Sequence, residues 1–265
     1  MRPRPPAQAR AGERRPDSGP RDARTGGAQM DALSAAHEPG QPAGLVGAVA
    51  FDVNETLTDL SALRGLFSTL GFDRTALDWW FAVLLRDGMA LAAAGDHGGF
   101  AQLAGAALQE IAAAQALPLP PDAVDALLAA FPELPLHADV RPALQALRRA
   151  GIPALALTNG GAAVAEQIMR HGGVRELFTD VLSVDAVQRW KPSREPYEHA
   201  ARLARLPVER VALVAVHPWD INGAAAAGMP TGWVNRGRVA YPAPFRPPTV
   251  QARSLDDVVA ALLSA

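Results

Sequence analysis

The sequence GAVAFDVNETLTD, at residues 47–59, is the point from which the rest of this 265-residue chain can be interpreted. Its apolar run at residues 48–51 predicts a short buried strand. Asp52 follows directly and enters a turn. Ligands of α/β folds bind beyond the carboxyl ends of the strands, so an acid at this position is a candidate nucleophile shielded from bulk water. A carboxylate that merely caps a turn or a helix fits the same stretch.

Composition narrows the class of protein. The formal net charge is −2, which gives no field for nucleic acid or an anionic membrane. Cysteine is absent, which excludes disulfides and thiolate chemistry. No uninterrupted apolar run approaches the roughly 18 residues that span a bilayer. We therefore expect a soluble, cytoplasmic protein with no nucleic-acid or membrane partner.

The basic residues are unevenly divided. Of 25 such residues 24 are arginine, and only Lys191 is lysine. The two side chains differ in reach, hydration and pKa range, so they are not equivalent in a tight site. Lys191 is therefore a candidate site residue, although a solvated surface lysine fits the composition as well.

Residues 1–43 are rich in Arg, Pro, Gly and Ala and contain almost no large apolar side chains. Such a segment cannot bury enough apolar surface to offset the entropy of ordering, so we expect a disordered tail. No apolar signal segment follows the pair formed by Arg14 and Arg15, which makes an export signal a poor interpretation. Met30 is an alternative start.

Residues 61–134 have apolar side chains at helical spacing, with breaks at Gly71, at residues 95–99 and at residues 118–121. A helical stretch of this length exceeds a simple crossover between strands. We therefore expect an inserted helical cap at residues 61–138, between core segments at 44–60 and 139–265. The glycines at 95–99 are either a flexible lid loop or an ordinary helix break.

Strands and helices alternate after residue 140. Apolar strands are predicted at residues 152–160, 178–185, 210–217 and 230–237, with helices between them and a last helix at 254–265. This alternation predicts an α/β fold whose core is a Rossmann-like, doubly wound parallel sheet.

Polar residues follow several of the predicted strands. The carboxyl ends of parallel strands meet at one edge of the sheet, where α/β folds bind ligands. We therefore expect one crevice to collect Asp52, Thr158, Asn159, Lys191 and Asp220. Each of these residues, taken singly, also fits a structural role as a cap or a solvated side chain.

Four segments occur in order along the chain: FDVNETLTD, ALTNG, RWKPSREPY and VAVHPWDINGAAAAGM. In this order they resemble the four motifs of the haloacid dehalogenase superfamily. The helical block after the first segment resembles that superfamily's cap domain, and the resemblance covers residues 44–260. It implies a Rossmann-like core, Asp52 as a covalent nucleophile, and Lys191 as the cation that stabilises the charge around it.

The phosphatases of this superfamily have a second Asp two residues after the nucleophile, and usually two acids in the last motif that hold Mg²⁺. This chain has Asn54 at the first of these positions, and an amide cannot donate and retrieve a proton near neutral pH. Its last motif offers Asp220 but has Val216 four residues earlier, so one carboxylate ligand is missing. These residues oppose the phosphatase alternative, and we expect no metal and no cofactor.

The pattern resembles the metal-free type II 2-haloacid dehalogenases, which share the WD pair and the KPxxxxY spacing. This resemblance implies that Asp52 attacks C2 of a small 2-haloacid and that halide leaves without protonation. Thr56 would position Asp52, and Lys191 would keep it ionised. Asp220 would orient or activate the water that hydrolyses the ester.

The same resemblance assigns the substrate contacts. Thr158 and Asn159 would bind the carboxylate or the halide, and Tyr197 would support the site. Type II dehalogenases tend to be homodimers, so a homodimer is a possible assembly here.

This chain departs from the dehalogenase pattern at two places. The resemblance predicts an Arg directly after a tryptophan of the cap, but Phe81 follows Trp80 here, and Arg86 is the candidate replacement. The last motif has Ala215 and His217 where a Ser and an Asn are expected. His217 is either a base for the water or a strand-end histidine bonded to backbone. A catalytically weak binding protein is therefore a further alternative.

The sequence leaves the roles of two further groups of residues open. Trp79, Trp80 and Phe81 cluster on one predicted helix and fit either ordinary packing or an apolar wall that excludes water from a site. Asn235 and Arg236, at the end of the last predicted strand, either reach the crevice or, more simply, cap that strand.

Overall fold

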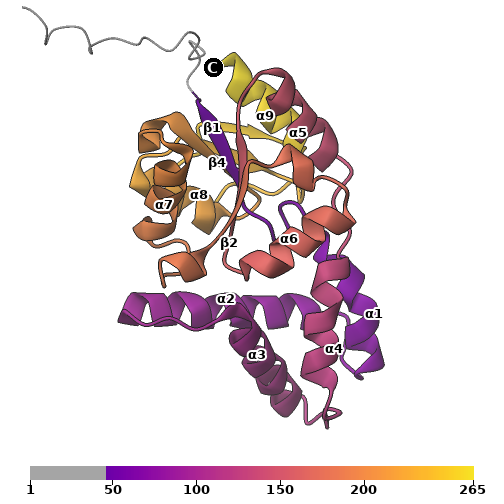
Figure 1. Cartoon of the computed structure of the whole chain (residues 1–265). Helices are drawn as coiled ribbons and strands as arrows, with labels where there is room; N and C mark the ends of the chain where they lie inside the picture. The colour runs from indigo at the N-terminus through magenta and orange to yellow at the C-terminus, as the bar shows by residue number, and fades with distance from the viewer. Residues whose placement is uncertain (1–45) are drawn as a thin grey trace, which may run out of the picture. The chain divides into compact units, whose positions relative to one another are not determined.

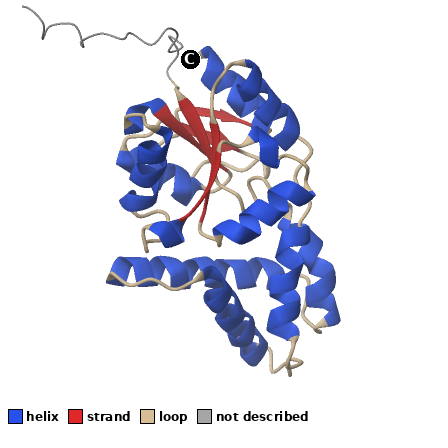
Figure 2. Cartoon of the chain, in the orientation of Figure 1, coloured by secondary structure: helices blue, strands red, loops and turns tan. Residues whose placement is uncertain are grey.

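The computed structural model describes residues 46–265, and the disordered tail expected at residues 1–43 lies outside the described residues. A six-stranded parallel sheet forms the core, in the order β3-β2-β1-β4-β5-β6 (Figure 1). The sheet and its flanking helices confirm the predicted α/β fold (Figure 2).

The central strands are β1 (Ala48–Phe51), β2 (Ala154–Thr158) and β4 (Val211–Ala215), and every residue in them is buried. Strands covered on both faces require continuous apolar runs, which is why these strands were visible in the sequence. The register places Ala50 beside Leu155 on one side and Leu213 on the other.

The sheet extends outward through β3 (Asp180–Ser183) on one side and β5 (Thr231–Val234) on the other. β6 (Val250–Ala252) forms the edge beyond β5 and was not predicted. Val250 and Ala252 are only partly buried and Gln251 is exposed, so the segment lacks the apolar run that marks the inner strands.

Helices cover both faces of the sheet. One face packs against α5 (Val140–Arg149), α6 (Ala162–His171) and α9 (Leu255–Ser264). The other packs against α7 (Arg194–Ala204) and α8 (Pro218–Ala227). Short 3₁₀ turns join these elements: η3 (Arg175–Leu177), η4 (Val184–Ala186) and η5 (Val208–Arg210).

The segment between β1 and α5 is helical, and Figure 1 shows it beyond one end of the sheet. It comprises η1 (Leu60–Leu63), α1 (Arg64–Thr69), α2 (Ala76–Ala94), α3 (Phe100–Ala114), α4 (Ala123–Ala130) and η2 (Phe131–Glu133). These helices bury a hydrophobic cluster of their own, which includes Trp80, Leu108 and Leu127. A bridge between Thr58 and Leu136 pairs the two connections that lead into and out of this helical cap.

Trp190, from the core, anchors the cap. Its indole packs on α2 at Gly88, where a Cβ atom would come within 2.3 Å of the ring, so only glycine permits this approach. The Trp190 Nε1–H donates to the carbonyl of Gly98, and His97 Nε2 lies 3.1 Å from Asp185 Oδ1. Gly95 ends α2 with a left-handed φ of 89°, as expected for a helix C-cap.

Within residues 46–265, no helix has both the length and the apolar character needed to cross a membrane.

Candidate active site

The Asp52 side chain lies at the carboxyl end of β1 and is only 4% exposed. Its Oδ1 atom accepts a hydrogen bond from Lys191 Nζ at 2.9 Å. Its Oδ2 atom accepts one from the Thr56 hydroxyl at 2.6 Å and lies 3.1 Å from Nδ1 of His217. The structure therefore brings together four residues that the sequence placed at different points of the chain.

Lys191 is completely buried, and its three ammonium protons all have acceptors. Besides Asp52, Nζ donates to Asp220 Oδ2 at 2.6 Å and to the carbonyl of Leu157 at 2.8 Å. The backbone of Lys191 is held by the amide of Asn159, which accepts from Lys191 N–H at 2.9 Å and donates to Lys191 O at 3.4 Å. Asn159 thus fixes the lysine loop, whereas the sequence pointed to a substrate contact.

Asp220 lies in the first turn of α8 and is also fully buried. Its Oδ1 atom accepts a 2.6 Å hydrogen bond from the hydroxyl of Tyr197, and its Oδ2 faces Lys191. Thr158, at the end of β2, accepts from Gly160 N–H at 2.9 Å, which leaves its hydroxyl proton available. Asp52, Lys191, Asp220 and Tyr197 therefore form one continuous hydrogen-bonded cluster.

The charges of this cluster set its protonation states. Burial works to raise the pKa of Asp52, but the charge of Lys191 and the hydrogen bond from His217 outweigh it and hold that pKa well below its usual range. Burial and the nearby charge of Asp52 raise the pKa of Asp220, against the attraction of Lys191. Burial works to lower the pKa of Lys191, but the two carboxylates raise it. Asp52 is therefore an ionised carboxylate beside a protonated lysine.

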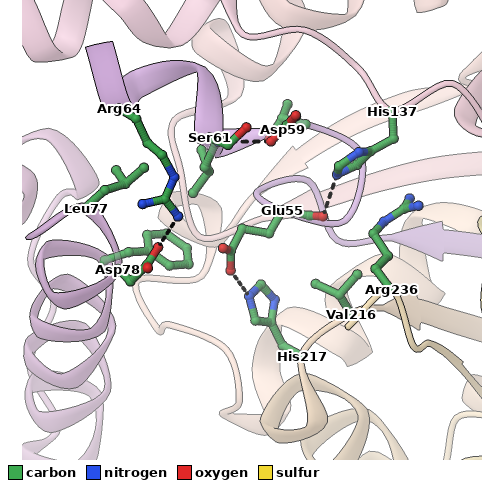
Figure 3. Close-up of a pocket in the computed structure, with 13 residues that line it drawn as sticks. Glu55, Asp59, Ser61, Arg64, Leu77, Asp78, His137, Val216, His217 and Arg236 are labelled. Atoms are coloured by element: carbon green, nitrogen blue, oxygen red, sulfur yellow. Dashed lines mark hydrogen bonds and ion pairs between the residues drawn. The ribbon is translucent and has the colours of Figure 1, made fainter. Parts of the chain in front are cut away.

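His217 lies between two carboxylates. Its Nδ1 atom is 3.1 Å from Asp52 Oδ2, and its Nε2 atom is 2.8 Å from Glu55 Oε2 (Figure 3). Burial works to lower the pKa of His217, but hydrogen bonds to Asp52 and Glu55 raise it to about 9. Both ring nitrogens are bonded to side chains, so the alternative of a strand-end histidine bonded to backbone is wrong.

Glu55 is a site residue that the sequence analysis missed. Its backbone has a left-handed φ of 60°, which is uncommon for a residue with a side chain and is found at functional turns. Its carbonyl oxygen lies 3.2 Å from Nε2 of His137, and its carboxylate reaches His217. The only signal in the sequence was an acid inside a tight turn next to Asp52.

Two cavities flank the cluster. The first and more polar cavity, of about 330 Å³, is lined by charged or ionisable side chains that include Glu55, Arg64, His137, His217 and Arg236 (Figure 3). Apolar side chains, Phe81 among them, complete its lining. The second, of about 260 Å³, lies on the other side of the turn after β1. Its lining is mainly apolar and includes Val53, Asn54, Phe100, Phe131, Thr158 and Val164.

Two residues expected in the site lie elsewhere. Arg86 is half exposed on α2 and pairs with Asp87 at 2.7 Å and Glu110 at 2.8 Å, and it lines neither cavity. Trp80 is buried in the cap, where its indole N–H donates to the carbonyl of Ala104. The structure thus brings Phe81 to the site but neither Trp80 nor Arg86.

Arg236, for which the sequence left two roles open, lines the polar cavity but is held by other groups. Its guanidinium pairs with Asp139 at 2.6 Å and donates to the carbonyl of Thr56 at 2.9 Å. Asn235 closes a local turn through Val239. Arg236 thus braces the turn after Asp52 from outside the hydrogen-bonded cluster, whereas Asn235 has a local role.

The donor set does not fit a divalent cation. Lys191 Nζ occupies the space between Asp52 and Asp220, where a shared metal ion would need to be. Val216 offers no side-chain oxygen, although Mg²⁺ prefers octahedral oxygen ligation. In the part of the chain that the structure describes, no three His, Asp or Glu side chains are grouped to hold a metal.

A doubly wound sheet that carries an inserted helical cap over a buried aspartate defines a capped α/β fold of the hydrolase type. The family model for haloacid dehalogenase-like hydrolases matches residues 46–228, and the chain belongs to this family.

Similar proteins of described activity are mostly dehalogenases. An (S)-2-haloacid dehalogenase 2 from Pseudomonas sp. (strain CBS-3) is 28% identical over 204 residues, which cover 73% of this chain and 85% of the relative. An (S)-2-haloacid dehalogenase H-109 from Pseudomonas putida is 30% identical over 49% of this chain, and the match spans only 58% of that relative. A plasmid phosphoglycolate phosphatase from Cupriavidus necator is 31% identical over 46% of this chain and 52% of its own length.

Solved structures agree with this placement. The crystal structure of an L-2-haloacid dehalogenase superposes with a TM-score of 0.78 at 27% identity, covering 82% of this chain and 98% of the other. The relationship therefore includes the core and the cap together.

Proposed function

We propose that the protein is a metal-independent hydrolase that cleaves the carbon–halogen bond of 2-haloalkanoic acids through an ester on Asp52. The observation that carries the proposal is the environment of Asp52, an ionised carboxylate that is buried and oriented by Lys191, Thr56 and His217. A carboxylate removed from bulk water and aimed by fixed donors is suited to nucleophilic attack. The dehalogenase relatives support the same chemistry.

The hydrogen bonds of Asp52 indicate which oxygen attacks. An ionised carboxylate offers about two lone pairs on each oxygen. The donors Thr56 and His217 use both lone pairs of Oδ2, whereas Lys191 uses only one of Oδ1. Oδ1 is therefore the oxygen with a lone pair for the substrate.

In the first step, a lone pair of Asp52 Oδ1 attacks C2 of the 2-haloacid. The Oδ1–C2 bond forms while the C2–halogen bond breaks, and the bonding electron pair leaves with the halide. No proton is transferred, so Asn54 in place of a second acid is no obstacle. Inversion at C2 is the stereochemical consequence of this displacement.

In the second step, water adds to Cγ of Asp52 and the Cγ–Oδ1 bond breaks. Asp220 takes the proton of the water, and Lys191, bonded to Oδ1, supplies the proton that the leaving alkoxide needs. The 2.6 Å hydrogen bond between Lys191 and Asp220 then returns the proton to the ammonium. The second proton of the water is released to solvent as Asp52 returns to its ionised state, so each turnover yields one halide ion and one proton, and the hydroxyl oxygen of the product comes from Asp52.

The apolar cavity is the proposed site for the alkyl part of the substrate. Lys191 Nζ bonds both Oδ1 and the carbonyl of Leu157 in β2, so Oδ1 faces the β2 side of the sheet. The apolar cavity lies on that side, because Thr158 at the end of β2 lines it. The Thr158 hydroxyl and Asn54 are the uncharged polar side chains placed to meet a carboxylate there, and Asp185, which also lines the cavity, is bonded to His97. Substrates with an apolar chain fit this lining.

The first experiment is halide release from (S)-2-chloropropionate, with and without EDTA, by the wild type and by Asp52→Asn. We expect release that persists in EDTA and disappears in the variant. A single turnover in H₂¹⁸O should give product without ¹⁸O, because its hydroxyl oxygen comes from Asp52. Mg²⁺-dependent cleavage of a phosphate ester with no halide release would contradict the proposal and favour the phosphatase alternative.

A further inference from the structure

The contact of His217 with two carboxylates fixes its charge on geometric grounds. Asp52 is ionised, and Glu55 presents a carboxylate oxygen 2.8 Å from Nε2. An ionised carboxylate only accepts hydrogen bonds, so both ring nitrogens must carry a proton. The ring is therefore an imidazolium, and it has no lone pair with which to act as a base.

We infer that His217 is a catalytic residue whose Nδ1–H, together with the Thr56 hydroxyl, forms an oxyanion hole for hydrolysis of the Asp52 ester. Glu55 is the positioning residue that orients the ring and keeps it charged. The inference rests on the proposed function, since it concerns the second step of that reaction.

The roles of the two Asp52 oxygens lead to this assignment. Once Oδ1 has bonded to the substrate, Oδ2 becomes the carbonyl oxygen of the ester. Water adding to Cγ drives the carbonyl electron pair onto Oδ2, and the negative charge of the tetrahedral intermediate develops there. In the resting enzyme Thr56 and His217 already direct donors at Oδ2, at 2.6 and 3.1 Å. Donors fixed near this distance before reaction are the main requirement of an oxyanion hole.

Both donors are held in place by other groups. The Thr56 oxygen accepts a 3.1 Å hydrogen bond from Val216 N–H, so its own proton points to Oδ2. The His217 ring is stacked on Trp219, with ring centroids 5.0 Å apart, and the Phe81 ring lies 6.1 Å away on the cap side. An aromatic face next to a cationic ring adds a favourable cation–π attraction.

The charges around the imidazolium are mixed. Asp52 and Glu55 contact it directly, and the same polar cavity contains Asp59, Arg64, Asp78, His137 and Arg236. Arg64 is paired with Asp78, and Arg236 with Asp139. Burial works to lower the pKa of His217, but its two carboxylate partners raise it to about 9, which agrees with the charge deduced from the contacts.

This assignment has a kinetic signature. A cation on Oδ2 draws electron density from the carboxylate, so it weakens the attack of the first step while it promotes the second. Removal of the cation should therefore slow ester hydrolysis selectively. The ester should then accumulate, which a structural role for His217 would not cause.

The test uses rapid-quench halide measurements and intact-protein mass spectrometry with (S)-2-chloropropionate. His217→Phe removes both donors but keeps an aromatic ring, and His217→Asn provides a smaller, neutral side chain in case the first variant does not fold. We expect a burst of halide stoichiometric with enzyme, an adduct on Asp52, and steady-state turnover lower by about 10²-fold or more, the usual effect of losing an oxyanion donor. Asp78→Asn, in the same cavity but outside the Asp52 cluster, is the matched control and should show no burst.

Glu55→Gln tests the positioning role. Its amide oxygen can still accept from Nε2–H, but the charge that favours the imidazolium is lost. We expect the alkaline limb of the kcat profile to move to lower pH than in the wild type. An unchanged limb would assign Glu55 a merely structural role.

The outcomes distinguish a failure of this inference from a failure of the proposed function. If the wild type releases halide and the His217 variants show neither a burst nor an adduct, this inference is overturned and the proposed function stands. A wild type that releases no halide overturns the proposed function, and this inference with it.

Discussion

The two cavities that flank the turn after Asp52 differ in character and have no lining residue in common. The cavity of about 330 Å³ has acids, arginines and histidines beside its apolar lining residues, whereas the cavity of about 260 Å³ is lined mainly by apolar side chains. The order of the strands explains the difference. Beside β1, β2 delivers Thr158 to the apolar side, and β4 leads to Val216 and His217 on the polar side.

This asymmetry gives the two oxygens of Asp52 different partners. On the β2 side Oδ1 has a single donor from Lys191, and on the β4 side Oδ2 has two. A symmetric carboxylate thus acquires one oxygen free to react and one that is restrained. The sheet topology, as well as the identity of the acid, therefore determines which oxygen reacts.

Removal of Lys191 should have the largest effect, because its ammonium bonds both buried carboxylates, Asp52 and Asp220. Lys191→Met keeps the volume but leaves Asp52 and Asp220 buried without their shared cation. Breaking a buried ion pair in this way costs about 3–5 kcal/mol of unfolding free energy. We expect urea denaturation to show a loss of this size, together with loss of halide release.

The double variant Lys191→Met/Asp220→Asn is the control for that experiment. It removes one of the two uncompensated charges, so part of the lost stability should return. Equal stability of Lys191→Met and the wild type would mean that the three charges are not coupled as their distances indicate.

His217, which lines the more polar cavity, should make the free energy of unfolding depend on pH. The pKa of His217 is raised from 6.5 to about 9 on folding, by its bonds to Asp52 and Glu55 against the effect of burial. A raised pKa contributes stability that is fully present below about 6.5 and is lost as pH rises through about 9. The total is about 3 kcal/mol, at about 1.4 kcal/mol per pKa unit.

The measurement is the free energy of unfolding of the wild type and of His217→Asn between pH 6 and pH 9.5. The difference between the two should shrink as pH rises. A difference that stays constant across this range would mean that His217 is not an imidazolium in the folded protein.

The apolar side should discriminate substrates by chain length. A buried methylene is worth about 0.8 kcal/mol, or about fourfold in kcat/KM, so activity should rise from 2-chloropropionate toward 2-chlorohexanoate. Val164→Phe should fill the cavity and flatten or reverse this trend. Val239→Phe, the same change at an exposed position, should leave it intact. A wild type that prefers the shortest acid would place the substrate chain elsewhere.

One physical reason explains why most of the predicted site residues could be located from the sequence. Buried parallel strands give continuous apolar runs, so the residues at their ends can be located without a structure. Asp52, Thr158 and Asp220 were found in this way, and Lys191 was found because it is the single lysine of the chain. The edge strand β6 lacks such a run and was missed.

Other parts depend on geometry that a pattern does not contain. Glu55 reaches His217 only because its backbone adopts a left-handed turn, and the two residues are 162 positions apart. Asn159 sits where a substrate contact was expected, but its amide is used to hold the Lys191 backbone. The place of Asn159 beside the crevice was predicted, but the partners of both side chains depend on the direction in which each one points, which position along the chain does not give.

Arg86 should have the smallest effect of all, and the reason lies in the helix. It follows Phe81 by five residues, and at about 3.6 residues per turn it is rotated about 140° around α2 from the ring that faces the site. Its guanidinium is half exposed and bonded to Asp87 and Glu110. We expect Arg86→Ala to keep the wild-type kcat and KM for (S)-2-chloropropionate.

Phe81→Ala is the informative partner of that variant, because the Phe81 ring lies 6.1 Å from the His217 ring and covers it from the cap side. Opening this side admits water to the imidazolium and weakens its attraction for Oδ2, so kcat should fall in Phe81→Ala but not in Arg86→Ala. A raised KM with unchanged kcat in Arg86→Ala would contradict this expectation, since it would mean that Arg86 leaves its carboxylate partners and binds the substrate. In that case the cap would supply a cation on substrate binding, and His217 would share the positive charge of the site with it.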